Sequence, residues 1–167
     1  MKQKLQTLFS PKAIAIICSF LMILTIFLPY AHAKKDFIEE LSYNANYYSS
    51  AGINYKKLIN PSLITYLKIY QTIDETSATI FKVLIGINVF FIGLTLLSAF
   101  KQKPIMMAIF NLLSILVFSI ISKTHNQFID TNNYNLSIAY YLFFISCILV
   151  FVCAIWMIFI KKVNASK

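Results

Sequence analysis

Three polar side chains interrupt the long apolar runs of this sequence, and chemistry inside a membrane would have to start from them. They are Lys82, Asn88 and Asn111. A polar group in such a run is costly and therefore marks either a function or a structural contact. Lys82 lies near one end of its run, where its long stem can reach the lipid headgroups. Asn88 lies near the middle of the same run, and its short side chain cannot reach the headgroups.

Amide and hydroxyl groups at matching depth can join neighbouring membrane helices. Asn111 and Thr95 are predicted to lie at similar depth, so we expect a hydrogen bond between them. Bonds of this kind contribute ~0.6–2 kcal/mol. We interpret Asn88, Thr95 and Asn111 as intramembrane polar contacts. The alternative is a solute pathway lined by Asn88.

The two histidines of the chain lie close in sequence to carboxylates. His32 precedes Asp36 and His125 precedes Asp130, and imidazole together with carboxylate can bind zinc. A metal site needs a third firm ligand, however, and the histidines show no metal-binding spacing. We therefore expect no metal site and two unrelated, solvated histidines.

The cysteines and glycines do not form any catalytic motif. Cys18, Cys147 and Cys153 all lie within apolar runs and form no C-x-x-C pair, so we interpret them as small packing residues. The chain has three glycines and neither a phosphate-binding loop, nor G-x-S-x-G, nor H-E-x-x-H. We expect no catalytic residue, no cofactor and no enzymatic activity.

Tyrosine is concentrated in the polar segment at 31–76. Tyrosine is favoured in protein interfaces, but it also rests on lipid headgroups, and the sequence leaves both interpretations open. The candidates for a partner surface are Tyr43, Tyr47, Tyr48, Tyr55, Tyr66 and Tyr70.

The composition is typical of a membrane protein. Hydrophobic residues make up 59% of the chain and its mean hydropathy is +0.71, whereas soluble domains are about 45–50% apolar. The net charge of +9 comes from 15 lysines without arginine. Because these lysines flank apolar runs and do not form one solvated face, we expect no nucleic-acid binding. Lysine without arginine, beside many Ile and Asn residues, indicates an AT-rich genome and favours a bacterial cytoplasmic membrane.

Four apolar runs are long enough to cross the bilayer as helices, since a crossing takes about 20 residues at ~1.5 Å each. Open strands are excluded because their N–H and C=O groups would have no partners in lipid. The sequence therefore predicts an all-α integral membrane protein, a four-helix bundle forming one domain. The predicted spans are 13–30, 77–100, 105–122 and 136–160.

The distribution of lysine predicts the orientation. The residues before the first span, the turn at 101–104 and the tail at 161–167 contain lysine and no acidic residue, so we expect them on the cytoplasmic side. The loops at 31–76 and 123–135 carry the acidic residues and are expected outside. Both termini are therefore predicted to be cytoplasmic.

The external loop at 31–76 is predicted to be partly helical. Asn60 followed by Pro61 is typical of a helix start and predicts a helix over 61–73, which could continue into the second span. A weaker helix is predicted over 35–43. The small and polar residues between the two indicate an irregular connection.

The end of the first run leaves two interpretations open. Ala31-His32-Ala33 follows a basic start, an apolar core and a proline, which matches a signal-peptide cleavage site. The apolar core is longer than the ~7–15 residues of a signal peptide, and Lys34 and Lys35 follow directly. We expect residues 1–33 to remain as the first membrane helix.

Four spans with a long first external loop resemble the topology of claudin-like tetraspan proteins. That family carries a tryptophan and a cysteine pair in this loop, and the present loop has neither, so the resemblance implies no site. The lack of catalytic motifs and the Tyr-rich loop favour a non-enzymatic accessory, regulatory or immunity-type protein. Its partner would be another membrane or extracellular protein, or a second copy of the chain. The alternative is a small oligomeric transporter or channel with a polar path near Asn88.

Overall fold

The computed structural model describes residues 10–50, 52–128 and 132–165, and helices make up 81% of this described part. The chain divides into two compact units. Unit 1 comprises Met1–Ile23, Gly86–Phe118 and Phe143–Lys167, and unit 2 comprises Leu24–Ile85 and Ser119–Leu142. The division falls within the long helices, so the same helices supply residues to both units.

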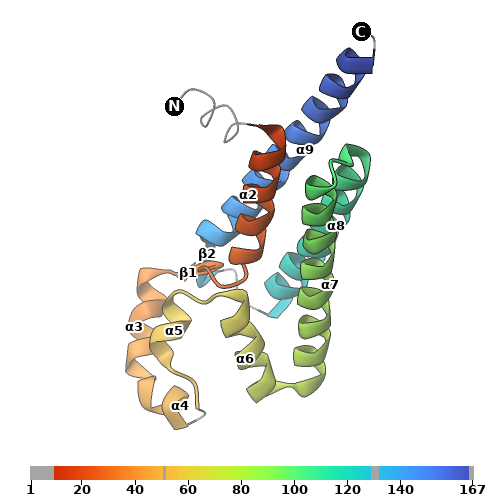
Figure 1. The fold of residues 1–167 in the computed structure, drawn as a ribbon. Coiled ribbons are helices and arrows are strands. Elements are labelled where there is room, and N and C mark those ends of the chain that lie inside the picture. Colours follow the sequence, from red (N-terminus) through yellow and green to blue (C-terminus); the bar gives the residue numbers. More distant parts are fainter. Residues whose placement is uncertain (1–9, 51, 129–131, 166–167) are drawn as a thin grey trace. The chain divides into compact units, whose positions relative to one another are not determined.

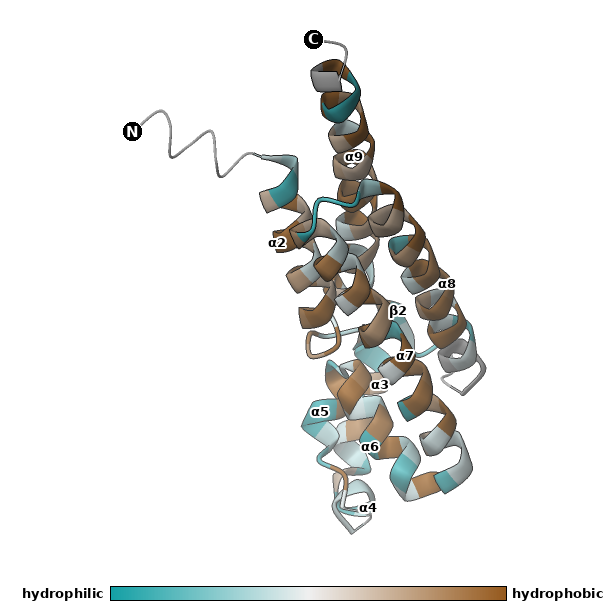
Figure 2. Ribbon diagram, turned by 45° about the vertical axis from the view of Figure 1, so that its right-hand side comes forward, coloured by the Kyte–Doolittle hydropathy of each residue, from teal (hydrophilic) through white to brown (hydrophobic). Residues whose placement is uncertain are grey.

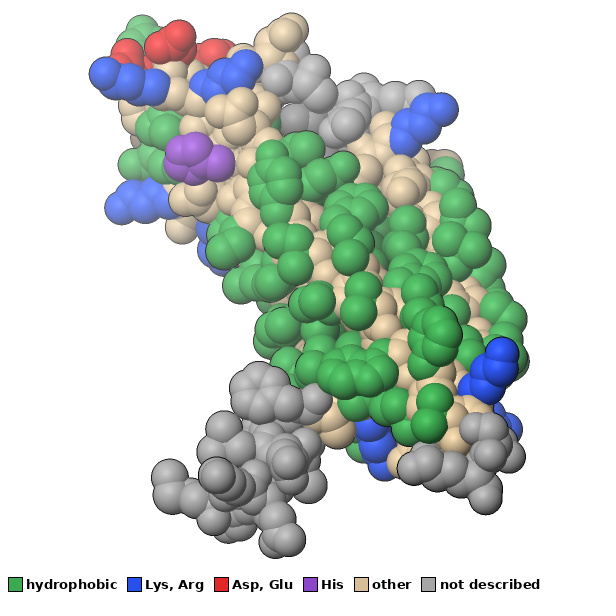
Figure 3. Space-filling model, turned by 90° about the horizontal axis from the view of Figure 1, so that it is seen from above, with side chains coloured by type: hydrophobic (Ala, Val, Ile, Leu, Met, Phe, Trp, Pro, Cys, Tyr) green, Lys and Arg blue, Asp and Glu red, His purple; other side chains and the backbone are tan. Residues whose placement is uncertain are grey.

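Three helices in the described part of the chain are long and apolar enough to cross a membrane. They are α7 (Glu75–Phe100), α8 (Pro104–Phe128) and α9 (Ile138–Ala165). At ~1.5 Å per residue each exceeds the ~30 Å of a hydrocarbon core. Hydrophobic residues run along these helices, and apolar side chains gather on their outer surface (Figures 2 and 3). The helical, membrane-embedded character predicted from the sequence fits this structure.

The first apolar run forms a shorter helix than predicted. α2 (Pro11–Leu24) has 14 residues, which is about 21 Å, whereas the predicted span was 13–30. The chain leaves the helix because Pro29 has no backbone N–H to donate and restricts the residue before it. The N–H of Tyr30 instead donates to the carbonyl oxygen of Pro61 at 2.8 Å. The end of the predicted span is therefore irregular and tied to another segment of unit 2.

A tight turn joins α7 and α8, which lie side by side and antiparallel (Figure 1). The N–H of Lys103 donates to Ser98 O at 2.9 Å and that of Gln102 to Ala99 O at 3.2 Å, which is the Schellman arrangement of a helix end. Gln102 takes the left-handed φ of 53° that this motif requires. Pro104 then starts α8, where its missing N–H is not needed.

Unit 2 contains a short antiparallel pair of strands and four short helices within its described residues. In the pair, Ala31 lies opposite Leu136 and Ala33 opposite Tyr134. Leu41 and Leu58 pack with Ala33 as a small buried core beside the strands. The elements are β1 (Ala31–Ala33), α3 (Lys35–Tyr43), α4 (Ala45–Ser50), α5 (Tyr55–Ile59), α6 (Leu63–Ile73) and β2 (Tyr134–Leu136).

The helices of the loop confirm part of the prediction. α3 has the predicted bounds of 35–43. The connection expected to be irregular contains α4 and α5. α6 begins at Leu63 and not at Pro61, because the hydroxyl of Ser62 accepts the N–H of Thr65 and caps the helix.

α6 does not continue into α7. Asp74 ends α6, and its carboxylate accepts the N–H groups of Thr76 and Ser77 at 3.0 and 3.1 Å. The Ser77 hydroxyl donates to the same carboxylate. An aspartate in this position caps a new helix, so α6 and α7 are separate helices that meet at Asp74.

Candidate functional site

Unit 1 buries several polar side chains in its largely apolar interior and exposes many apolar side chains on its surface. The buried polar residues within it are Ser19, Asn88, Thr95, Ser98, Asn111, Ser114 and Ser146. By contrast, Phe90, Leu116 and Phe159 are 61%, 53% and 63% exposed. Water would reverse this distribution, whereas hydrocarbon favours it, because polar groups need partners there.

Asn88 finds its partner on the neighbouring helix. The Ser114 hydroxyl on α8 donates to Oδ1 of Asn88 on α7 at 2.8 Å. Asn88 is 2% exposed and Ser114 is fully buried. Asn88 therefore makes a polar contact between two helices, with a serine that was not among the predicted contact residues.

Asn111 and Thr95 do not bond to each other as expected. Asn111 Nδ2 donates to the carbonyl oxygen of Cys147 on α9 at 3.0 Å. The Thr95 hydroxyl donates to Phe91 O within its own helix at 2.9 Å. The predicted pairing assumed that the Asn111 side chain faces α7. In the structure this side chain faces α9. Within the described residues, the buried Oδ1 of Asn111 has no hydrogen-bond partner.

These contacts connect α8 to both α7 and α9, and no titratable side chain takes part in them. Lys82, the charged residue of the second run, is exposed. Cys18, Cys147 and Cys153 are buried free thiols, as expected for packing residues. The contacts of α8 with α7 and α9 are therefore made by amide, hydroxyl and carbonyl groups.

The tyrosines of unit 2 separate into buried and exposed members. Tyr66 and Tyr70 are 3% and 7% exposed, so they cannot belong to a partner surface as predicted. Burial raises the pKa of Tyr66 strongly and that of Tyr70 to about 12. Sequence analysis missed their burial because they belong to an amphipathic helix whose inner face carries aromatic residues.

Tyr43 and Tyr47 are the exposed members, at 91% and 72%. The Tyr47 ring meets that of Tyr48 edge to face at 5.7 Å. Tyr48 and Tyr55 are partly buried against the core of Leu41 and Leu58. The candidate surface of six residues therefore reduces to two exposed rings with two half-buried ones behind them.

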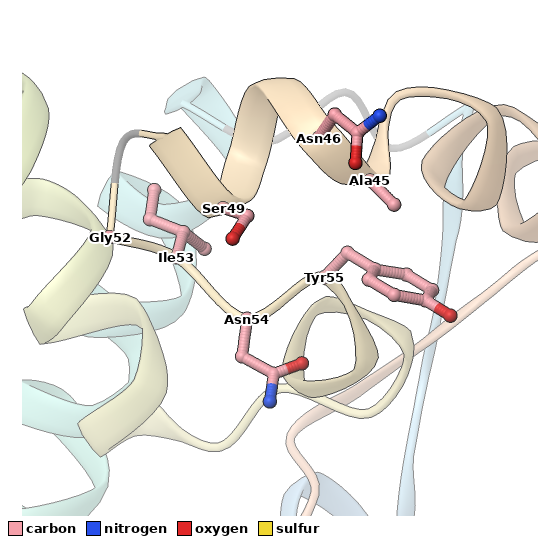
Figure 4. Close-up of a pocket in the computed structure, with 7 residues that line it drawn as sticks. All are labelled: Ala45, Asn46, Ser49, Gly52, Ile53, Asn54 and Tyr55. Atoms are coloured by element: carbon pink, nitrogen blue, oxygen red, sulfur yellow. The ribbon is translucent and has the colours of Figure 1, made fainter.

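An open cavity of about 490 Å³ lies between α4 and the start of α5 (Figure 4). Asn46 and Ser49 contribute polar groups from α4, and Tyr55 contributes its ring from α5. Asn54 lies on the chain between them, where its Oδ1 accepts the N–H of Lys56 at 3.0 Å. None of the described residues that line the cavity carries a charged side chain.

Tyr134 joins the strand pair to this part of unit 2. Its hydroxyl donates to the carbonyl oxygen of Leu58 at 2.9 Å, and its ring meets Phe37 edge to face at 5.3 Å. Burial, followed by the nearby Tyr48, raises the pKa of Tyr134 to about 12. The sequence analysis did not select Tyr134 as a site residue, and its place opposite Ala33 in the strand pair could not be read from periodicity.

His32 is the histidine whose side chain the structure describes. His32 Nδ1 lies 2.6 Å from Asn60 Oδ1, so this amide does not cap a helix as predicted. The side chain of His125 and the whole of Asp130 lie outside the described residues. Among the residues whose positions are given, no group of three or more His, Cys, Asp or Glu side chains could hold a metal ion.

Comparison with known proteins assigns the chain to no family. Neither protein-family models, nor curated proteins, nor solved structures gave a match to the chain. The class is therefore defined by the fold itself. It is a mostly helical protein with three helices, among the described residues, that can span a membrane and with several polar side chains buried between its helices.

Proposed function

We propose that this chain is a four-span protein of a bacterial cytoplasmic membrane, with both termini in the cytoplasm, that acts by binding another protein outside. α7, α8 and α9 supply three crossings, and α2 with the apolar residues up to Tyr30 supplies the fourth. The lysine-rich, acid-free segments at 101–104 and 161–167 support the orientation.

The strand pair supports retention of the first apolar run. Ala31 and Ala33, the small residues of the cleavage motif, are 3% and 1% exposed. They lie in β1, which pairs with β2, and the N–H of Lys34 donates to Asn133 O at 2.9 Å. Cleavage after Ala33 would remove β1 and its contacts from unit 2.

The observation that carries the contact proposal is an ordered polar lobe with exposed aromatic rings. We call residues 35–59 the α3–α5 lobe. Leu41 and Leu58 give the lobe its own core, so its surface is held in shape. Tyr43 and Tyr47 lie on its surface, 91% and 72% exposed. Preformed surfaces with rigid aromatic side chains lose little entropy on binding, which is why such residues dominate many interfaces.

Site-specific photo-crosslinking in the native cells tests this proposal. A benzophenone amino acid is placed at Tyr43 or Tyr47, and as a matched control at Ile73, which is 73% exposed in the same unit. We expect one defined adduct from both tyrosine positions and none from Ile73. An absence of adducts at Tyr43 and Tyr47, or the same adduct from Ile73, would contradict the contact proposal.

The transporter alternative requires Asn88 to contact a solute. Its Oδ1 already accepts from Ser114, and the side chain is 2% exposed, which favours the structural interpretation. Solute flux in vesicles reconstituted with the full chain separates the two functions. Flux that is present in the wild type and lost in Asn88→Leu would support the pathway and overturn the contact proposal.

A further inference from the structure

The charges of the chain are distributed unequally between its two units. Among the residues that the structure describes, unit 1 contains five lysines and no Asp or Glu. Within that part of the unit, no Asp or Glu side chain can pair with the lysine ammonium groups. They can therefore interact with an anion from outside the unit.

A cavity of about 360 Å³ lies among these lysines. It is lined by Lys103, Pro104, Ile105, Met106, Ile158 and Lys161. Lys103 and Lys161 supply positive charge, and the other lining residues form an apolar floor. Lys161 Nζ donates to Gln102 O at 2.6 Å, which fixes the end of α9 beside the turn between α7 and α8.

The position of the cavity in the fold matches a headgroup region. It lies within unit 1 where α7 ends, α8 begins and the apolar part of α9 ends. Ile105 and Met106 belong to the first turn of α8, whose N–H groups have no acceptors in their own helix. Lys103 directly precedes that turn, and its ammonium group can donate hydrogen bonds to an anion. Positive charge and free N–H donors above an apolar floor suit a phosphate attached to an acyl chain.

We propose that this cavity binds an anionic phospholipid. The phosphate contacts Lys103 and Lys161, and an acyl chain lies along Ile105, Met106 and Ile158. The site requires only that unit 1 is embedded in a membrane. It does not depend on the orientation of the chain or on the proposed protein contact.

The test measures thermal unfolding of the purified full-length chain in a neutral detergent. The additives are phosphatidylglycerol, phosphatidylcholine and inorganic phosphate. We expect a saturable rise in the unfolding temperature with phosphatidylglycerol alone. Phosphatidylcholine producing the same rise would show that the charge is irrelevant, and inorganic phosphate producing it would show an anion site and no lipid site. Either result overturns the proposal.

Paired variants locate the site. Each lysine near anionic lipid is worth about 1 kcal/mol, so Lys103→Gln with Lys161→Gln should weaken the apparent affinity about 30-fold. The control Lys56→Gln with Lys57→Gln removes two lysines from unit 2 and should leave the affinity unchanged. Unchanged affinity in the first pair, or an equal loss in the control pair, would refute the assignment.

Lys161 also holds the turn, so its replacement could prevent folding. Two further variants keep the test decisive. Lys161→Arg retains the charge and should bind phosphatidylglycerol as the wild type does. Met106→Trp leaves every charge in place but fills the cavity and should abolish the rise. Wild-type binding by Met106→Trp would contradict the proposed acyl contact.

Discussion

The Ser114 hydroxyl donates a 2.8 Å hydrogen bond to Asn88 Oδ1 and thereby joins α8 to α7. Both side chains are buried among apolar residues of unit 1. Asn88 is therefore part of the packing between two antiparallel helices.

A double-mutant cycle on this pair tests its strength. Asn88→Leu and Ser114→Ala, alone and combined, should show a coupling of ~0.6–2 kcal/mol, because a bond between membrane helices is worth that much. The measurement is the unfolding free energy in lipid bicelles by steric trapping. The control cycle of Asn88→Leu with Asn111→Leu should show coupling near zero. Zero coupling in the first cycle would mean that the bond does not stabilise the bundle.

Asn111 should tolerate replacement better than Asn88. Its Nδ2 donates to Cys147 O, but within the described residues its buried Oδ1 has no partner. A buried acceptor left unsatisfied costs about 1–3 kcal/mol, so Asn111→Leu removes a penalty together with one bond. We expect the unfolding free energy to fall by no more than about 0.5 kcal/mol, or to rise. A loss above about 2 kcal/mol would show that Oδ1 does bind a water or ligand.

Asp74 should stabilise the start of α7 in a pH-dependent way. The Ser77 hydroxyl, then the N–H groups of Ser77 and Thr76, lower the pKa of Asp74 below its usual 3.8. A lowered folded pKa means stability that is present above pH 3.8 and is lost as the pH falls through the folded pKa. The effect is small because Asp74 is exposed and solvent screens its charge.

The comparison for Asp74 uses two variants and thermal unfolding. Asp74→Ala should unfold at a lower temperature than the wild type at pH 7, and the difference should shrink as the pH falls below 3.8. Asp74→Asn keeps a capping oxygen without a charge. Its stability should therefore lie between the other two at neutral pH. A wild-type advantage over Asp74→Ala that grows on acidification would contradict the assignment.

Local sequence signals predicted the elements whose cause is local. The helix over 35–43 and the turn at 101–104 follow from propensity, from Pro104 and from the lysines. The start of α6 was misplaced because Asn60 was taken as the cap. In the structure this amide bonds His32, and Ser62 caps the helix. Both residue types cap helices well, so only the tertiary contact decides between them.

Contacts between segments far apart in the sequence could not be predicted. Asn111 bonds a carbonyl 36 residues later, and periodicity does not say which neighbouring helix a polar residue faces. Tyr66 is buried because α6 packs inside unit 2. The concentration of tyrosine in the segment at 31–76 did not distinguish Tyr66 from the exposed Tyr43. The membrane class was predictable because it depends on the length and apolarity of the runs, which need no partner.

The intact mass of the membrane-extracted protein tests whether the first apolar run is retained. The integration of Ala31 and Ala33 into β1 predicts a mass that includes residues 1–33. Electrospray measurement of the purified chain decides the question. A mature chain beginning at Lys34 would refute the four-span proposal.

Reporter fusions test the central claim, the four-span topology, most directly. A reporter that is active only outside the cytoplasmic membrane is inserted at Tyr55, near Asn132, at Lys103 and after Lys167. We expect activity at Tyr55 and near Asn132, and silence at Lys103 and after Lys167, where a cytoplasm-active reporter should work instead. External activity at Lys103 would contradict the orientation, and with it the proposal that the α3–α5 lobe meets its partner outside the cell.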